Sequence, residues 1–115
     1  MKRVQVSFVE LTVQTDVLPL VSGYLHANAI TDPELAESHD FHYFCEALSV
    51  PRQDLLAALL AREADVYAIS CYVWNMGVIK YLIRELRQAR PDAAFILGGP
   101  QVINHAEKYL GPRLW

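Results

Sequence analysis

The sequence lacks any apolar run close to the roughly 18 residues that a membrane-spanning helix requires. Residues 1–11 hold two basic residues and only a short apolar stretch, which ends at Glu10 without a small-residue cleavage site. This start is typical of a first strand and not of a secretory signal peptide, so we expect a cytoplasmic protein with no membrane partner. The length of 115 residues suits one domain with one core.

An excess of basic charge is also missing, since the net charge at pH 7 is −3. The lysines and arginines of residues 80–90 alternate with apolar positions at helical spacing, and we expect them to form a solvated outer face. A protein that binds nucleic acid generally shows a basic face instead. The charge therefore indicates no nucleic-acid partner.

Cysteine is scarce. Cys45 and Cys71 are too few and too far apart for a disulfide framework or a zinc site, and each is expected to be a small apolar filler. His39 and His42 form an H-x-x-H pair, a spacing that can serve a metal ion. Their aromatic, strand-like surroundings favour a structural role, so we predict neither metal ligands nor catalytic residues in this chain.

The usual nucleotide-binding motifs are absent. No GxGxxG follows the first apolar run, since residues 9–15 contain no glycine, and no GxxxxGK[ST] occurs anywhere. The third predicted strand ends in Ser70 and not in the acidic residue that a phosphate-accepting receiver domain requires. Dinucleotide binding, triphosphate binding and phosphoryl acceptance are all disfavoured.

Four short apolar runs alternate with helical patterns along the chain. Strands are predicted at residues 4–11, 41–45, 65–70 and 93–100, the last running into a glycine turn; the second could instead be a helical turn. Helices are predicted from residue 15 or 16 to about 28, from residue 51, over 75–90 and, as a short one, within 102–110. The alternation predicts a doubly wound parallel α/β sheet of the flavodoxin-like (Rossmann-like) class. Five strands are usual and four are visible, so we expect residues 1–115 to be a truncated domain.

Three helices have apolar positions that define an expected inward face. The first should turn Val17, Val21, Tyr24 and Leu25 to the core, and the second should turn Leu55, Leu56, Leu59 and Leu60. The third has an apolar stripe of Met76, Ile79, Leu82, Ile83 and Leu86.

Polar and glycine residues follow three of the predicted strands. Ligands of open parallel sheets bind beyond the carboxyl ends of the strands, and the first, third and fourth strands should be neighbours. Each loop alone has a structural alternative, because a glycine pair can be only a turn, an aromatic can cap the core, and Asn75 can be the N-cap of the next helix. Together, the loops at residues 11–15, 70–75 and 98–101 predict a shared binding surface for a large, flat, partly polar ligand.

Residues 65–102 closely resemble the cobalamin-binding domain at the N-terminus of B12-dependent radical S-adenosylmethionine enzymes. The shared features are a strand, a loop of the form S-x-Y-x-W-N, a helix, a proline and a strand ending in Gly-Gly-Pro. Of the three elements of the wider B12-binding fold, S-x-L appears as Ser70-Cys71-Tyr72 and Gly-Gly as Gly98-Gly99. The element D-x-H-x-x-G is missing, and Thr12 stands near the position of its histidine.

The resemblance implies cobalamin, with its cobalt ion, bound base-off and without a histidine ligand. A cobalt without a strong axial donor is easier to reduce and better suited to pass a methyl group. The loop from Thr12 to Thr15 would meet the lower face of the corrin, Tyr72 to Trp74 its rim, and Ser70 with the glycine turn its nucleotide tail. The implied cofactor-binding residues are Leu11, Thr12, Gln14, Thr15, Ser70, Cys71, Tyr72, Val73, Trp74, Asn75, Gly98, Gly99, Pro100 and Gln101.

The three-cysteine motif C-x-x-x-C-x-x-C, which holds the 4Fe-4S cluster of radical S-adenosylmethionine enzymes, is absent. This chain alone therefore cannot cleave S-adenosylmethionine. The resemblance implies that a radical S-adenosylmethionine catalytic domain, in cis or in trans, completes a methyltransferase and binds the cluster and S-adenosylmethionine. The alternative is an α/β interaction or small-ligand-binding domain that has lost the cofactor.

Overall fold

A four-stranded parallel sheet forms the centre of the computed structural model, which describes residues 2–110. The strands are β1 (Val4–Thr12), β2 (His39–Ala47), β3 (Val66–Ser70) and β4 (Ala94–Gly98), in the order β2-β1-β3-β4. The predicted parallel α/β class is confirmed, and β1, β3 and β4 are neighbours as expected. The segment that could have been a helical turn is a strand, paired with β1 along its whole length.

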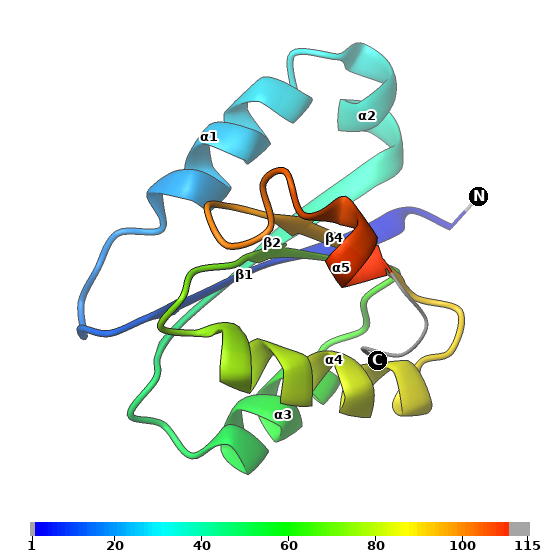
Figure 1. Ribbon diagram of the computed structural model, residues 1–115. Helices are drawn as coiled ribbons and strands as arrows, with labels where there is room; N and C mark the ends of the chain where they lie inside the picture. The colour runs from blue at the N-terminus through cyan, green and yellow to red at the C-terminus, as the bar shows by residue number, and fades with distance from the viewer. Residues whose placement is uncertain (1, 111–115) are drawn as a thin grey trace.

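Five helices connect and cover the strands within the described residues: α1 (Leu20–Ala29), α2 (Pro33–Ser38), α3 (Arg52–Leu60), α4 (Met76–Ala89) and α5 (Ala106–Leu110). In Figure 1, α3 and α4 lie on one face of the sheet, and α1 and α2 lie on the other. Helix α2 was not predicted; it begins at Pro33, where the Asp32 side chain caps it by accepting a hydrogen bond from the Glu34 N–H (2.9 Å). No helix within residues 2–110 is long and apolar enough to cross a membrane.

The main core lies between the sheet and helices α3 and α4. All five residues of the predicted α4 stripe are buried, as are Leu55 and Leu59 of α3. Tyr67 of β3 is fully buried and stacks on Phe95 of β4, with ring centroids 5.4 Å apart. Cys71 belongs to the same core, so its predicted role as a filler is confirmed. Since apolar periodicity and close packing coincide here, this half of the molecule follows the prediction.

The prediction for the first helix is wrong in both its start and its inward face. Asp16 has a left-handed backbone (φ 59°), which a helix cannot contain, and α1 begins only after Pro19. Val17, Val21, Tyr24 and Leu25, which were expected to face the core, are all exposed, Tyr24 at 78%. The one buried residue of α1 is Ser22. Helix α1 therefore packs loosely over its face of the sheet and leaves space beneath it.

Candidate functional site

Backbone hydrogen bonds hold the loops after β3 and β4 together. The N–H of Cys71 donates to the carbonyl of Gly98 (2.7 Å), and the N–H of Gln101 donates back to the carbonyl of Cys71 (3.1 Å). Gly99, between these bonds, has a φ of +100°, and a Cβ at this position would lie 2.7 Å from the Cys71 carbonyl oxygen. Only glycine fits such a position without strain, so the second glycine of the pair is a requirement of the backbone.

The loops after β1 and β3 are joined by the side chain of Asn75, which is fully buried. Its Nδ2 donates to the carbonyls of Leu11 and Ser70, each at 3.1 Å, and its Oδ1 accepts from the N–H of Tyr72 (2.8 Å). The side chain makes no capping bond to α4, although Asn75 occupies the N-cap position. Asn75 is thus a cross-link between strand ends, and the three loops converge at one edge of the sheet.

A cavity of about 470 Å³ opens between the loop after β1, the start of α1 and the loop after β3; we call it the outer cavity. Tyr72 and Trp74 form one wall, with their rings stacked at a centroid distance of 4.6 Å and an interplanar angle of 9°. Trp74 is 52% exposed, unusually open for so large an apolar ring. The lining residues are Glu10, Leu11, Thr12, Val13, Gln14, Val17, Leu18, Leu20, Val21, Tyr72 and Trp74.

A second cavity of about 280 Å³, the inner groove, lies between α1 and strands β1, β3 and β4. Its floor includes the small residues Ala68, Ser70 and Gly98, and a Cβ at Gly98 would meet nothing within 4 Å. The groove is lined by Phe8, Val21, Ser22, Leu25, Ala68, Ile69, Ser70, Tyr72, Ile96, Gly98 and Gly99. Because Val21 and Tyr72 line both cavities, the two spaces adjoin.

The predicted site residues are brought to one edge of the sheet, but they play different parts there. Leu11, Thr12, Gln14, Tyr72 and Trp74 line the outer cavity, whereas Ser70, Tyr72, Gly98 and Gly99 line the inner groove. The side chains of Cys71 and Asn75 are fully buried beneath these surfaces. Like Cys71 and Asn75, four exposed or partly exposed residues border neither cavity: Thr15, Val73, Pro100 and Gln101.

Sequence reasoning missed the contribution of α1 and of the sheet surface beneath it. Val21, Ser22 and Leu25 were either assigned to the core or passed over, yet all three line the inner groove. Glu10 was treated only as the end of a strand, although its carboxylate borders the outer cavity. A signal was available, because the apolar residues of α1 are not gathered on one face, as they usually are in a helix that packs on a sheet at the surface.

None of the four histidines, all within the described residues, lines either cavity. His26 Nδ1 lies 2.7 Å from the Tyr43 hydroxyl, beneath α1. His42 bonds Gln5 (2.8 Å) and Arg62 (2.9 Å), and His39 bonds Ser38 (2.7 Å). Residues 2–110 contain no cluster of three side chains that could ligate a metal. Both residues of the H-x-x-H pair make hydrogen bonds to neighbouring protein side chains.

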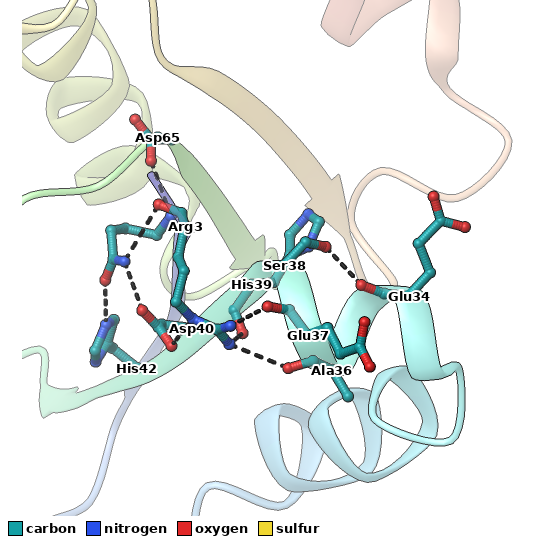
Figure 2. A network of polar contacts seen from close by, with 10 residues as sticks. Arg3, Glu34, Ala36, Glu37, Ser38, His39, Asp40, His42 and Asp65 are labelled. Atoms are coloured by element: carbon teal, nitrogen blue, oxygen red, sulfur yellow. Dashed lines mark hydrogen bonds and ion pairs between the residues drawn. The ribbon is translucent and has the colours of Figure 1, made fainter. Parts of the chain in front are cut away.

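Both H-x-x-H residues belong to a polar network at the opposite, amino end of β1 and β2 (Figure 2). The Arg3 guanidinium donates to Asp40 (2.8 Å) and to backbone carbonyls of residues 36, 37 and 39 at the end of α2. Asp40 also accepts from the Gln5 amide (2.7 Å), and these two bonds hold the pKa of its carboxyl below the usual range. This network ties α2 to β1 and lies away from both cavities.

Neither cysteine offers a reactive thiolate. Burial raises the pKa of the Cys71 thiol to about 11, against an ordinary value of 9.0. Burial also raises the pKa of Cys45, and the charges of Glu10 and Glu46 raise it further. Both thiols are protonated at neutral pH, so neither is suited to act as a nucleophile or metal ligand there.

A family model and two similar proteins relate this chain to cobalamin-binding and cobalamin-dependent proteins. The model of the B12 binding domain matches residues 20–113. A cobalamin-dependent radical SAM methyltransferase, TokK of Streptomyces tokunonensis, is 34% identical over 85 residues, which are 74% of this chain and 12% of that protein. The 2-(S-pantetheinyl)-carbapenam-3-carboxylate methyltransferase of Streptantibioticus cattleyicolor is 33% identical over 88 residues, with the same two shares. The chain thus spans about an eighth of the length of these relatives.

Among solved structures, a cobalamin-binding protein from Desulfitobacterium hafniense DCB-2 has a similar fold, with a TM-score of 0.63 at 16% identity. The match covers 96% of this chain and 50% of that one. The outer cavity lies at the carboxyl ends of β1 and β3, where open parallel sheets bind their ligands, and the inner groove extends from Ser70 and Gly98 over the face of the sheet. With a family model matching most of its length, this chain belongs to the B12-binding domain family.

Proposed function

We propose that this domain binds cobalamin base-off and without a histidine ligand, on behalf of a B12-dependent radical S-adenosylmethionine methyltransferase. The observation that carries the proposal is the pair of adjoining cavities at one sheet edge, into which no histidine projects among residues 2–110. One cavity is wide and partly aromatic, and the other is narrow and floored by small residues. Such a pair suits a ligand with a broad ring and a slender tail.

The outer cavity supports the placement of the corrin ring. Its wall of stacked Tyr72 and Trp74 rings provides flat apolar area, and Thr12 and Gln14 of the facing loop provide neutral polar groups. Exposed aromatic rings lose unfavourable contact with water when a flat ligand covers them. The lower face of the corrin would then meet Thr12 and Gln14, and the two aromatic rings would lie at its rim, with no imidazole to reach the cobalt.

The inner groove supports the placement of the displaced nucleotide tail. Ser70 and Gly98 leave its floor low, and the space beside Gly98 is open. The apolar walls, from Phe8, Leu25 and Ile96, suit the benzimidazole of the tail, and the Ser70 hydroxyl suits one of its polar atoms. The fold does not need a glycine at residue 98, so its lack of a side chain favours a binding role.

The remaining predicted residues would act around these two surfaces. Thr15, Val73 and Pro100 are exposed, so only the periphery of a large ligand would reach them. The Gln101 side chain donates to the Tyr109 hydroxyl (3.0 Å) and would act by holding its loop. The buried Leu11, Cys71 and Asn75 would contribute through backbone atoms and by fixing the loops. Bound cobalamin would supply a cobalt that carries a methyl group, and the residues named here bind and orient it.

The two similar methyltransferases support the wider role. Both are methyltransferases, and one is cobalamin-dependent and radical SAM. Because this chain has no three-cysteine motif, the 4Fe-4S cluster and S-adenosylmethionine would be bound by a catalytic domain in cis or in trans. That domain would approach the outer cavity, where the cobalt would be accessible.

The test is to mix the purified chain with hydroxocobalamin, desalt it, and record the absorbance of the protein fraction. We expect retained cobalamin at a ratio near one per chain. After reduction to Co(II), the electron paramagnetic resonance spectrum should lack the splitting that an axial nitrogen produces. A colourless protein fraction would overturn the proposal in favour of a domain that has lost the cofactor. A nitrogen-split spectrum would overturn only the base-off, histidine-free mode.

A further inference from the structure

The carboxylate of Glu10 reaches from β1 to helix α1. Its Oε2 accepts two hydrogen bonds from Ser22, one from the backbone N–H (3.0 Å) and one from the hydroxyl (2.5 Å). Glu10 is 9% exposed and Ser22 is 2% exposed, so the pair is shielded from solvent. Hydrogen bonds to a buried charged group are among the stronger ones in proteins.

Helix α1 has no cap of its own. Pro19 stands at the N-cap position without a side-chain hydrogen bond, and the first turn contains no acidic residue. Ser22 is the third residue of the helix, so its N–H has no acceptor within the helix. Glu10 supplies that acceptor, and its negative charge lies at the positive end of the helix dipole. The sheet therefore caps the helix from outside.

The pair stands where the two cavities meet. Glu10 lines the outer cavity, Ser22 lines the inner groove, and Val21 between them lines both. The rest of α1 is loosely held, since Ser22 is its one buried residue and its other polar link to the sheet is the bond between His26 and Tyr43 near its far end. The height of the first turn of α1 above the sheet is thus fixed by Glu10 and Ser22.

We propose that Glu10 is a positioning residue that, through Ser22, sets the width of the inner groove and so selects corrinoids that carry a nucleotide tail over tail-less ones. The inference rests on the proposed function, because it assigns the groove to the tail of cobalamin. It goes further in naming the residue pair that makes the domain discriminate between whole cobalamin and cobinamide, the same ring without the nucleotide.

The experiment compares Glu10→Gln and Ser22→Ala with the unaltered domain, using hydroxocobalamin and diaquacobinamide as ligands and measuring dissociation constants by titration. We expect each variant to lose about tenfold in affinity for hydroxocobalamin, and less than about twofold for diaquacobinamide. Glu107→Gln and Ser49→Ala are matched controls, since both residues are exposed and line neither cavity. Neither control should change either constant.

Equal losses for both ligands, or no loss at all, would overturn the inference, because a merely structural role cannot distinguish the two corrinoids. An unaltered domain that binds both ligands equally would overturn it as well, while the ring site of the proposed function would stand. An unaltered domain that binds neither ligand would overturn both proposals. Circular dichroism checks that each variant folds. Ser22→Ala keeps the hydrogen bond from the backbone N–H to Glu10, so if Glu10→Gln does not fold, the affinities of Ser22→Ala for the two corrinoids test the inference.

Discussion

The Nδ2 of Asn75 donates a hydrogen bond to the carbonyl oxygen of Leu11, 64 residues earlier in the chain, at 3.1 Å. The same amide group also donates to the carbonyl of Ser70. A single side chain therefore joins the carboxyl ends of β1 and β3. The loops that carry Thr12 and Tyr72 are held at a fixed separation, and the outer cavity lies between them.

Replacing Asn75 by aspartate keeps the shape of the side chain and removes both donors. The new carboxylate oxygen would face two carbonyl oxygens in a buried place, so we expect the free energy of unfolding to fall by about 2–4 kcal/mol. Urea denaturation measures the loss, and cobalamin retention should fall with it. Asn104→Asp is the control, because Asn104 is exposed and lines neither cavity. An Asn75→Asp domain as stable as the unaltered one would contradict the cross-link.

Gly98 and Gly99 should respond oppositely to added side chains. Gly98→Val projects into open space, so the domain should keep its stability within about 0.5 kcal/mol and lose about tenfold or more in cobalamin affinity. Gly99→Ala places a Cβ against the Cys71 carbonyl at a left-handed φ, and should cost about 2 kcal/mol or more of stability. Ala94→Val, at an exposed position of the same strand outside both cavities, is the matched control. Undiminished binding by Gly98→Val would argue against a ligand in the inner groove.

Trp74→Ala should reduce cobalamin affinity by about tenfold or more while leaving the midpoint of thermal unfolding nearly unchanged. The indole is half exposed and stacks only on Tyr72, so its removal opens no cavity in the core. Calorimetric titration and thermal circular dichroism measure the two effects. Tyr24→Ala removes an even more exposed aromatic from α1, outside both cavities, and should leave affinity unchanged. If the two variants bound cobalamin with equal affinity, Trp74 would not be part of the site for the corrin ring.

The Cys71 thiol should make the folded state less stable in alkali. Its pKa is about 11 in the fold and near 9.0 when unfolded, so between these values the unfolded chain loses the proton first. Stability from this group is complete below pH 9 and declines as the pH rises toward 11, by about 2–3 kcal/mol at most. Denaturation at pH 7, 9 and 10.5 should show a shallower decline for Cys71→Ala. Parallel declines for the two proteins would mean that the thiol is not the source.

The half of the molecule around α4 could be predicted because two signals agree there. Met76, Ile79 and Leu86 recur at helical spacing, and the helix packs tightly, so the inward face is the apolar one. Helix α1 could not be predicted in the same way. Its apolar residues are not gathered on one face, and the helix lies over a groove instead of a packed core, so periodicity does not identify its inward side.

The role of Asn75 shows a second limit of sequence reasoning. Asparagine before a helix is most often an N-cap, and the position was correct, but the hydrogen bonds go to strands far away in the sequence. Such partners depend on the fold and leave no local pattern. Glu10 was overlooked for the same reason, because its partner Ser22 lies on the far side of an irregular loop. The turn at Gly98 and Gly99 could be predicted, because a backbone with positive φ, such as that of Gly99, favours glycine and so leaves a local pattern in the sequence.

The backbone hydrogen bonds that join Cys71 to Gly98 and Gln101 are made between protein groups, and together they hold the loops after β3 and β4 in place. A site whose walls are already set loses little conformational entropy when it is filled. Loading of such a domain should therefore be governed by how fast the ligand arrives and by the freedom of α1, and not by slow refolding of the loops.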